Sequence, residues 1–543
     1  MVTAAARRLK EMGSWLEIRR SRRSRPRANE IFARISRQPG APVEGNVLCE
    51  ALWDNAYHWL RLAMFRNAVA EIYGGGLIGV FPNDVVGAYY SLDELFGSMR
   101  ALPLTGEEVL PTSAKSSYLR AAERLLGPIK GPRQILELEL PKGFPAYSFY
   151  DGVLKSQQLG SVDCSDPNVR HYLGLLLQYL DFYDELLDRR AVHAVVVSHG
   201  SHLRYTSLIW AALRRKAPVF VINYVNESIT IRKLASLADY AMPVEFPTVS
   251  QRDTLSPETR KRLIAAGREY LKLLRSGQAG QINVVDGYLG DRERYKDRRR
   301  LQELLGVNPA RPNAVIMTSC WPDFPHMYGR SYYTDFQDWL ELTLEAIADI
   351  KDCNWILKPH PAERFYGNKV TLAKLVHGRL SADVFLWPEG VSGNALDAFA
   401  DVIVTCIGTA GIEHPAMGKT VLGASSSPYE PWGFCHHSLT AEEYRGALKK
   451  IVQLEPPDTR QQEDAQVYAA LTYTSPLETR GRNGEYVYPW GALGYRLWPG
   501  LPDFVRRNSE CLQYEIRMMR RWLESGTHSY NVFKGLNPDL WGK

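Results

Sequence analysis

The sequence predicts an α/β protein with two Rossmann-like domains in tandem, each a parallel sheet covered by helices on both faces. Short, continuously apolar segments recur along the 543 residues and alternate with segments whose apolar residues have helical spacing. A charged, Arg- and Lys-rich stretch near residues 257–300 interrupts this alternation and separates two halves. These two observations predict the fold class.

In the first half, apolar runs predict strands at residues 77–81, 194–197 and 219–223. A long helix before the second of these runs has its N-terminus at Asp166 and Pro167, residue types that favour helix starts. In the second half, the helix predicted at residues 335–350 has Thr334 as its expected cap. The strands expected there are at residues 314–318, 354–358, 384–387, 402–406 and 420–422.

Four regions follow from this pattern. We expect a basic N-terminal arm at residues 1–44, an N-terminal Rossmann-like domain at residues 45–285 and a C-terminal Rossmann-like domain at residues 286–455. After residue 456 the strand rhythm stops, and an aromatic-rich segment at residues 456–543 is expected to pack back on the domains.

The basic arm holds nine Lys and Arg residues against two Glu residues between positions 7 and 27. It is either a solvated tail or a peripheral anchor on anionic lipid. No apolar run is long enough for a signal peptide core or a membrane-spanning helix, so we expect a cytoplasmic protein. If the arm is an anchor, it contacts the inner face of the plasma membrane. The net charge of +6 is modest for this length and does not favour nucleic-acid binding.

The seven cysteines are scattered and never spaced as CxxC. This argues against a disulfide framework and against structural zinc. No acidic pair with metal-ligand spacing lies near the expected site, so we predict a protein without a metal or other cofactor.

Ligands of open α/β sheets bind beyond the carboxyl ends of the strands. The strand at residues 354–358 ends in Lys358-Pro359-His360-Pro361, a turn fixed by two prolines and followed by Glu363. A held imidazole beside a lysine suits a phosphate or a nucleotide oxygen, and the alternative is a rigid turn with a structural histidine.

The strand at residues 402–406 leads into Gly408-Thr409-Ala410-Gly411-Ile412-Glu413. Small residues allow close approach of a ligand, and a helix starting here presents its positive end to an anion. Thr409 adds a hydroxyl donor, and Glu413 either complements the helix dipole or accepts hydrogen bonds from a ribose or sugar hydroxyl. The alternative is a tight turn that needs glycine for packing.

Two further loops carry candidate chemistry. Ser198-His199-Gly200-Ser201-His202 follows a strand of the first domain, where His199 is a candidate for acceptor binding or base catalysis or is a packed histidine beside a capping Ser201. The loop at residues 319–326 contains Asp323 and His326 among aromatic residues and prolines, which indicates either an ordered cleft loop or a surface cap.

These strings together resemble bacterial capsule and surface-polysaccharide biosynthesis glycosyltransferases, related to Kdo transferases. The resemblance is carried by residues 316–326, by residues 335–363, by residues 408–421 and, in the first half, by Tyr150-Asp151-Gly152 and Ser198-His199-Gly200. It implies the GT-B arrangement of two Rossmann-like domains and a nucleotide-sugar donor, such as a CMP-activated sugar, as the substrate.

The resemblance also implies roles for residues. His360 and Pro361 would contact the nucleotide, while Gly408, Thr409 and Gly411 would contact its phosphate. Lys358, His360 and the helix start would then stabilise the leaving phosphate without a metal, and a carboxylate or histidine would deprotonate the glycan or lipid-linked acceptor. The candidates for that catalytic group are Asp151, His199, Asp323 and Glu363.

Three other functions fit part of the pattern. A transferase that moves a polyol phosphate from a CDP-alcohol shares the fold and a His-Pro turn. A non-catalytic biosynthesis or export partner would bind polysaccharide through the aromatic C-terminal segment. A sugar-nucleotide 2-epimerase also has two Rossmann domains, but the basic arm and the long C-terminal segment argue against it.

Overall fold

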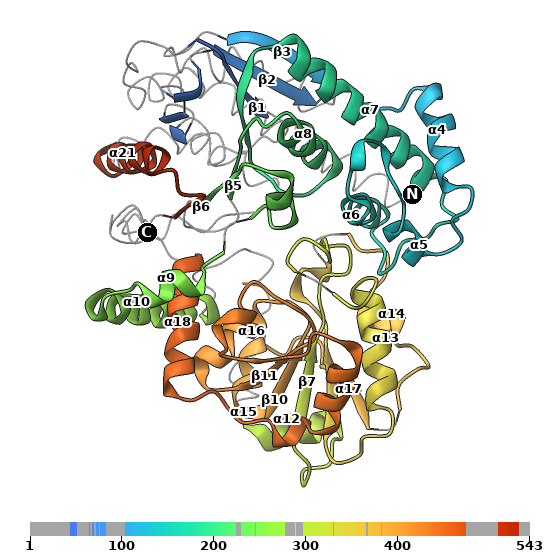
Figure 1. The fold of residues 1–543 in the computed structure, drawn as a ribbon. Coiled ribbons are helices and arrows are strands. Elements are labelled where there is room, and N and C mark those ends of the chain that lie inside the picture. Colours follow the sequence, from blue (N-terminus) through green and yellow to red (C-terminus); the bar gives the residue numbers. More distant parts are fainter. Residues whose placement is uncertain are drawn as a thin grey trace, which may run out of the picture. The chain divides into compact units, whose positions relative to one another are not determined.

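The computed structural model divides into two compact units, each built from separate stretches of the chain (Figure 1). Unit 1 comprises residues 1–122, 173–245 and 475–543, and unit 2 comprises residues 123–172 and 246–474. The residues that the structure describes are 44–50, 64–65, 68–69, 72–74, 76–82, 104–223, 230–244, 246–276, 288, 297–329, 331–364, 367–381, 383–473 and 509–531. The predicted basic arm therefore lies outside the described residues, apart from its last position.

Unit 1 contains a seven-stranded sheet in the order β13-β6-β5-β4-β1-β2-β3. The strands from β1 to β5 pair in parallel, whereas β6 and β13 join one edge in antiparallel orientation. Their bounds are β1 (Asn46–Glu50), β2 (Gly76–Pro82), β3 (Leu104–Leu110), β4 (Val192–Val197), β5 (Val219–Asn223), β6 (Thr230–Leu234) and β13 (Ser529–Asn531). The C-terminal segment thus returns to this sheet through β13.

Unit 2 contains a six-stranded, fully parallel sheet in the order β12-β11-β10-β7-β8-β9. Its strands are β7 (Asn313–Met317), β8 (Asn354–Lys358), β9 (Val384–Leu386), β10 (Val402–Thr405), β11 (Thr420–Gly423) and β12 (His436–His437). The prediction of two Rossmann-like α/β units is confirmed, because each sheet has a parallel core whose strand order reverses on either side of its first strand.

Alternate residues of the strands in unit 2 face two separate cores. Ile316 of β7 packs in the core that includes Trp339 of α13 (Phe336–Ile347) and Tyr444 of α17 (Ala441–Lys449). Its neighbour Val315 packs in the second core, with Phe399 of α15 (Leu396–Phe399). Both faces of the sheet are therefore covered, and this explains why its strands are continuous runs of apolar residues in the sequence.

The remaining helices surround these sheets. Those wholly in unit 1 are α8 (Leu203–Arg214), η4 (Leu237–Ala241) and α21 (Ser509–Ser525), and α4 (Ser116–Leu126) and α7 (Asn168–Arg189) run from one unit's residues into the other's. Unit 2 adds α5 (Pro132–Leu136), η3 (Pro141–Gly143), α6 (Ala146–Gln157), α9 (Val249–Asp253), α10 (Pro257–Arg275), α12 (Arg298–Leu305), η6 (Pro361–Arg364), α14 (Leu372–Leu375), η7 (Gly393–Ala395), α16 (Ala410–Glu413), η8 (Pro415–Met417), η9 (Glu430–Trp432), η10 (Ile451–Gln453) and α18 (Thr459–Tyr473).

Helix α6 belongs to unit 2 although its sequence lies in the first half of the chain. The hydroxyl of Tyr150 donates a hydrogen bond to the carboxylate of Asp335, the residue that caps α13. The amide of Lys369 also donates a hydrogen bond of 2.9 Å to the carbonyl of Gln158, the residue that follows α6. The cap predicted at Thr334 is wrong by one residue, because the Asp335 side chain accepts the hydrogen bond from the amide of Asp338.

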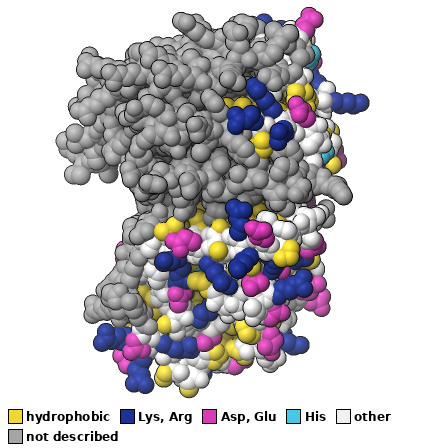
Figure 2. All heavy atoms as spheres, turned by 90° about the vertical axis from the view of Figure 1, so that its left-hand side faces the viewer, with side chains coloured by type: hydrophobic (Ala, Val, Ile, Leu, Met, Phe, Trp, Pro, Cys, Tyr) yellow, Lys and Arg dark blue, Asp and Glu magenta, His cyan; other side chains and the backbone are white. Residues whose placement is uncertain are grey.

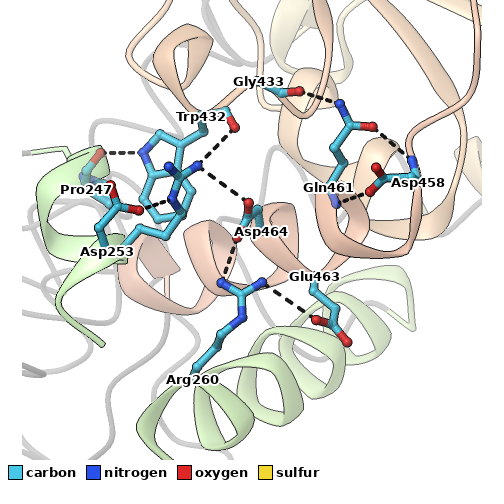
Figure 3. A network of polar contacts seen from close by, with 10 residues as sticks. Pro247, Asp253, Arg260, Trp432, Gly433, Asp458, Gln461, Glu463 and Asp464 are labelled. Carbon is cyan, nitrogen blue, oxygen red and sulfur yellow. Dashed lines mark hydrogen bonds and ion pairs between the residues drawn. The ribbon is translucent and has the colours of Figure 1, made fainter. Parts of the chain in front are cut away.

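Helix α18 is held against α9 and α10 by a charged network (Figure 3). The buried carboxylate of Asp464 accepts hydrogen bonds from Arg260, at 2.7 Å, and from Arg252, at 3.5 Å. Next to this network, Gly267 of α10 lies so close to the backbone of Gln466 that a Cβ atom would overlap it. This part of the C-terminal segment therefore packs tightly within unit 2.

No helix among the described residues is long and apolar enough to cross a membrane.

Candidate functional site

The strand order of unit 2 has its switch point at the carboxyl ends of β7 and β10. These strands are neighbours, but the chain continues from β7 toward β8 on one side and from β10 toward β11 on the other (Figure 1). Loops that leave such a switch point in opposite directions open a space for a ligand. Around this point the chain places the loop after β7, the end of β8 and the turn after β10.

Lys358 ends β8 and is 7 % exposed. Its carbonyl accepts hydrogen bonds from the amide of Thr318, at 3.0 Å, and from the hydroxyl of Thr318, at 3.1 Å, so its backbone is fixed to the end of β7. Burial lowers the pKa of the lysine to about 8, although the charge of Glu413 opposes this shift. Among the described residues, no carboxylate lies within ion-pair distance of its ammonium group.

His360 and Pro361 follow in the turn, and Pro361 begins η6. Burial, aided by the nearby charge of Lys358, lowers the pKa of His360 to about 4, while the charge of Asp323 opposes the shift. The imidazole is therefore neutral near pH 7. It can form a hydrogen bond to a ligand without adding a second positive charge beside Lys358.

The turn after β10 contains backbone N–H groups without an acceptor in the described part of the chain. In α16, the amides of Gly411, Ile412 and Glu413 donate to the carbonyls of Gly408 and Thr409. The described residues provide no acceptor for the N–H groups of Gly408, Thr409 and Ala410. Three such N–H groups in one turn are suited to binding an anion.

Gly411 has a packing role in this turn. A Cβ atom at Gly411 would overlap the ring of Tyr429, whose hydroxyl donates a hydrogen bond of 2.9 Å to the carbonyl of Gly408. The glycine is therefore needed for the approach of Tyr429, which agrees with the alternative of a turn that needs glycine for packing. Gly408 meets only the hydroxyl of Thr405 at its Cβ position.

Both oxygens of Glu413 are engaged inside the protein. The hydroxyl of Thr409 donates to Oε1 at 2.6 Å, and the hydroxyl of Tyr288 donates to Oε2. The hydroxyl of Thr409 therefore donates to Glu413 and not to a ligand. The donor that Thr409 can offer to a ligand is its backbone N–H. Burial, with the charge of Glu413, raises the pKa of Tyr288 well above its ordinary value, so Tyr288 remains a neutral donor.

Asp151 lies on α6 and is 4 % exposed. Its Oδ1 lies 2.6 Å from Nδ1 of His326, and its Oδ2 accepts a hydrogen bond of 3.2 Å from the amide of His326. Burial raises the pKa of Asp151, and the contacts with His326 oppose that shift. The carboxylate is thus bound to a single residue of the loop after β7.

Asp323 lies in the same loop and forms an ion pair of 3.1 Å with Lys155 of α6. Its side chain is 37 % exposed, and its charge acts on both Asp151 and His360. Asp323 is therefore near enough to influence the charge of both Asp151 and His360. The ammonium of Lys155 also lies over the ring of Phe324, 5.4 Å from its centre.

Glu363 occupies a different position. Its Oε1 accepts hydrogen bonds from Nε1 of Trp321, at 2.5 Å, and from the amide of Leu372, at 2.8 Å. Burial raises the pKa of Glu363, although both hydrogen bonds oppose the shift. These contacts join η6 to the loop after β7 and to α14. Glu363 therefore holds these segments in place.

His199 lies in unit 1, after β4. Its Nδ1 is 2.7 Å from the hydroxyl of Ser201, and its ring stacks on that of Tyr205 at 5.6 Å. The preceding residue, Ser198, donates from its amide to the buried carboxylate of Glu50 at 2.9 Å. This places His199 at the equivalent switch point of the other sheet, between β1 and β4.

The structure thus gathers the predicted donor residues with Asp151, Asp323 and Glu363 in unit 2, and His199 belongs to unit 1. Sequence reasoning did not single out Tyr288, Glu50 or the contact of His326 with Asp151. Asp151 and His326 are 175 positions apart, so no local sequence pattern indicates their contact. His326 itself lies in a loop that had been named as a candidate from the sequence. No group of three His, Cys, Asp or Glu residues with metal-binding geometry occurs in the described part of the chain.

Comparison with known proteins gives no family model and no curated protein that matches the chain. Solved structures with similarity include KpsC, a β-Kdo 2,4 transferase of Thermosulfurimonas dismutans, at 15 % identity and a TM-score of 0.32, covering 51 % of this chain and 79 % of that one. A glycosyltransferase of Rickettsia africae has 12 % identity and a TM-score of 0.25, covering 87 % and 98 %. A UDP-GlcNAc 2-epimerase of Neisseria meningitidis has 11 % identity and a TM-score of 0.22, covering 78 % and 97 %. Similarities this distant assign no residue and no activity to this chain.

Proposed function

We propose that this protein is a glycosyltransferase that binds a nucleotide-activated sugar, such as a CMP-activated sugar, in unit 2. It would transfer the sugar to a surface polysaccharide or to a lipid-linked acceptor. The nucleotide-sugar is a substrate in this proposal, and no cofactor takes part.

The observation that carries the proposal is the buried ammonium group of Lys358, which has no counter-ion among the described residues. A buried cation is costly unless an anion compensates it. The turn after β10 adds the N–H groups of Gly408, Thr409 and Ala410, for which the described residues provide no acceptor. Together these groups supply what the phosphate of a nucleotide-sugar requires.

These donors also fit the chemistry of transfer. As the bond between the sugar and the phosphate breaks, negative charge develops on the leaving phosphate oxygens. Fixed N–H groups and an ammonium stabilise that charge in the transition state more than in the bound substrate, which lowers the barrier. His360, neutral near pH 7, donates or accepts one further hydrogen bond at the same place.

Two candidate proton acceptors belong to the same unit. Asp323 lies in the loop that leads from β7, and Asp151 of α6 contacts His326 of that loop. Of the two, Asp323 is already paired with Lys155, whereas Asp151 is buried and held by His326. We therefore favour Asp151 as the group that takes the proton from the acceptor hydroxyl.

The described part of one face bears on the question of a nucleic-acid partner. On the face shown in Figure 2, acidic and basic side chains of the described residues are interspersed. Nucleic-acid binding would require a continuous basic surface.

The test uses the purified full-length chain and a panel of nucleotide-sugars, with release of free nucleotide as the readout. We expect at least one donor to be turned over, and His360→Ala to reduce turnover by about tenfold or more, as expected for loss of a hydrogen bond at the reacting phosphate. His377→Ala is the matched control, because His377 is an exposed histidine of the same unit.

If no donor in the panel is turned over and none raises the melting temperature, the proposal fails. Phosphate from a CDP-alcohol found in the acceptor product would instead identify a polyol-phosphate transferase. Binding of a donor without nucleotide release in the presence of acceptor extracts would favour a non-catalytic partner.

A further inference from the structure

Two ion pairs connect α6 to the loop after β7. Asp151 and Lys155 are four positions apart and lie on one face of the helix, while Asp323 and His326 are three positions apart in the loop. Asp151 pairs with His326, and Lys155 pairs with Asp323, so the two pairs have opposite polarity. This double contact fixes the position of the loop relative to α6.

The pair of Asp151 and His326 is less exposed to solvent than the pair of Lys155 and Asp323. The side chains of His326 and Asp151 are 14 % and 5 % exposed, whereas that of Asp323 is 37 % exposed. The ring of Tyr150 contacts the ring of His326 edge-on at 5.4 Å, and Tyr147 lies at 6.4 Å. Water therefore has little access to the bonded carboxylate, and its direction is set by the protein.

Several groups around the pair favour a charged imidazole. Burial lowers the pKa of His326, but Asp151, the charge of Asp335 and a hydrogen bond to the backbone of Thr334 outweigh burial, and the net shift is upward. Asp323 of the loop adds a further negative charge near Asp151. The phenols that face the pair stay neutral near pH 7, since burial raises the pKa of Tyr147 to about 12 and shifts those of Tyr150 and Tyr328 upward as well.

We propose that His326 is a positioning residue, which holds Asp151 as an aligned carboxylate so that Asp151 accepts the proton of the acceptor hydroxyl. The inference rests on the proposed transferase function. In the step, the acceptor O–H bond breaks and its proton passes to the carboxylate of Asp151. The acceptor oxygen bonds to the anomeric carbon, and the bond from that carbon to the phosphate oxygen breaks with its electron pair on the phosphate.

Two observations make Asp151 the proton acceptor and His326 the positioning residue. Nδ1 of His326 lies 2.6 Å from Oδ1 of Asp151, and the ring packs against Tyr150, so this nitrogen is occupied by Asp151 and does not take a substrate proton. Among the described residues, each oxygen of Asp151 has one hydrogen-bond contact, and a carboxylate oxygen accepts two.

The first experiment needs no donor. In a deuterated sample with labelled histidine rings, nuclear magnetic resonance follows the titration of His326, whose signals are identified by their loss in His326→Asn. We expect both ring nitrogens to be protonated at pH 7 and the pKa of His326 to fall in Asp151→Asn. A ring with one unprotonated nitrogen at pH 7 in the unmodified protein would overturn the proposal, whatever the activity.

The second experiment uses the donor identified by nucleotide release. His326→Asn keeps a donor for Asp151 but removes the positive charge. We therefore expect kcat to fall about tenfold or more while the dissociation constant for the nucleotide stays within about threefold. Losing the charge also raises the pKa of Asp151, and the acid limb of the pH–rate profile should therefore move to higher pH. His377→Asn, at an exposed histidine of the same unit, should change neither quantity.

A double-mutant comparison separates positioning from general loosening. Asp151→Asn should abolish most of the turnover, and adding His326→Asn to it should cost little more, because both residues act through one carboxylate. Additive losses, or a lower melting temperature with an unmoved acid limb, would show a merely structural histidine and refute the inference. Failure to find any donor would count against the transferase function, while the titration would still decide the role of His326.

Discussion

Replacing Lys358 by methionine should make the ligand-free protein more stable and destroy its binding of nucleotide. Methionine fills a similar volume without a charge. The fall in the pKa of Lys358 from 10.5 to about 8 means that the charged lysine costs the folded protein about 3 kcal/mol at pH 7. Removing that charge should return stability of this order, which corresponds to an increase of several degrees in Tm.

The dependence on pH gives the prediction its sign. The folded protein releases the proton of Lys358 at a lower pH than the unfolded chain does. Stability of the unmodified protein should therefore rise, relative to Lys358→Met, as pH increases from about 8 toward 10.5, and the difference of about 3 kcal/mol should shrink to about 1 kcal/mol at pH 10. Below pH 8 the difference should be nearly constant.

The assay is denaturant unfolding of both proteins at pH 7 and pH 10, with nucleotide binding measured by calorimetry. We expect the affinity for nucleotide to fall ten- to a hundredfold in Lys358→Met, as is typical when a hydrogen bond to a charged group is lost. Lys261→Met, at an exposed lysine of α10, should change stability by less than about 0.5 kcal/mol and leave binding intact. A Lys358→Met protein that is less stable at pH 7, or a difference that grows with pH, would refute the reasoning.

Three other substitutions test the packing of unit 2 and the choice of carboxylate. Gly411→Ala should lower the free energy of unfolding by about 1–3 kcal/mol through overlap with the Tyr429 ring, as seen in a thermal melt, and an unchanged Tm would show that the ring can move aside. Asp464→Asn should destabilise the protein by about 3 kcal/mol, because Arg252 and Arg260 lose their buried partner. The control Glu463→Gln should be nearly neutral, because its ion pair is more exposed. Denaturant unfolding measures both, and equal effects would contradict the prediction. Glu363→Gln should keep nucleotide release within a few fold, because an amide oxygen still accepts the hydrogen bonds of Trp321 and Leu372, and complete loss would make Glu363 a catalytic candidate again.

Local patterns located the strands with long apolar runs, but not β1, β3, β6, β12 or β13, which were not predicted from the sequence. The strand predicted at residues 354–358 has the observed bounds of β8, and the expected strand at residues 219–223 has those of β5. Apolar runs of this kind arise because a strand covered on both faces meets only apolar neighbours. The cap at Asp335 was missed by one position because Thr and Asp at consecutive positions are both suitable caps, and only the observed hydrogen bond to Asp338 separates them.

The membership of α6 in unit 2 could not be read from the sequence. No helix was predicted at residues 146–157, most of which are buried in α6, and a local pattern does not say which distant residues bury them. The hydrogen bond between Tyr150 and Asp335 and the pair formed by Asp151 and His326 are decided by contacts across more than 170 positions. Sequence order alone therefore assigned residues 123–172 to the first domain, whereas the contacts group them with the second.

By itself, the sequence determined the two α/β units and the turns at Lys358 and Gly408, because strand periodicity and turn chemistry are local properties. Tertiary structure decided what those turns can do. Burial, without a carboxylate at ion-pair distance among the described residues, makes Lys358 a lysine of lowered pKa, and the ring of Tyr429 explains Gly411. The partner of Asp151 was likewise decided there, since solvation and charge proximity depend on residues brought together from distant parts of the chain.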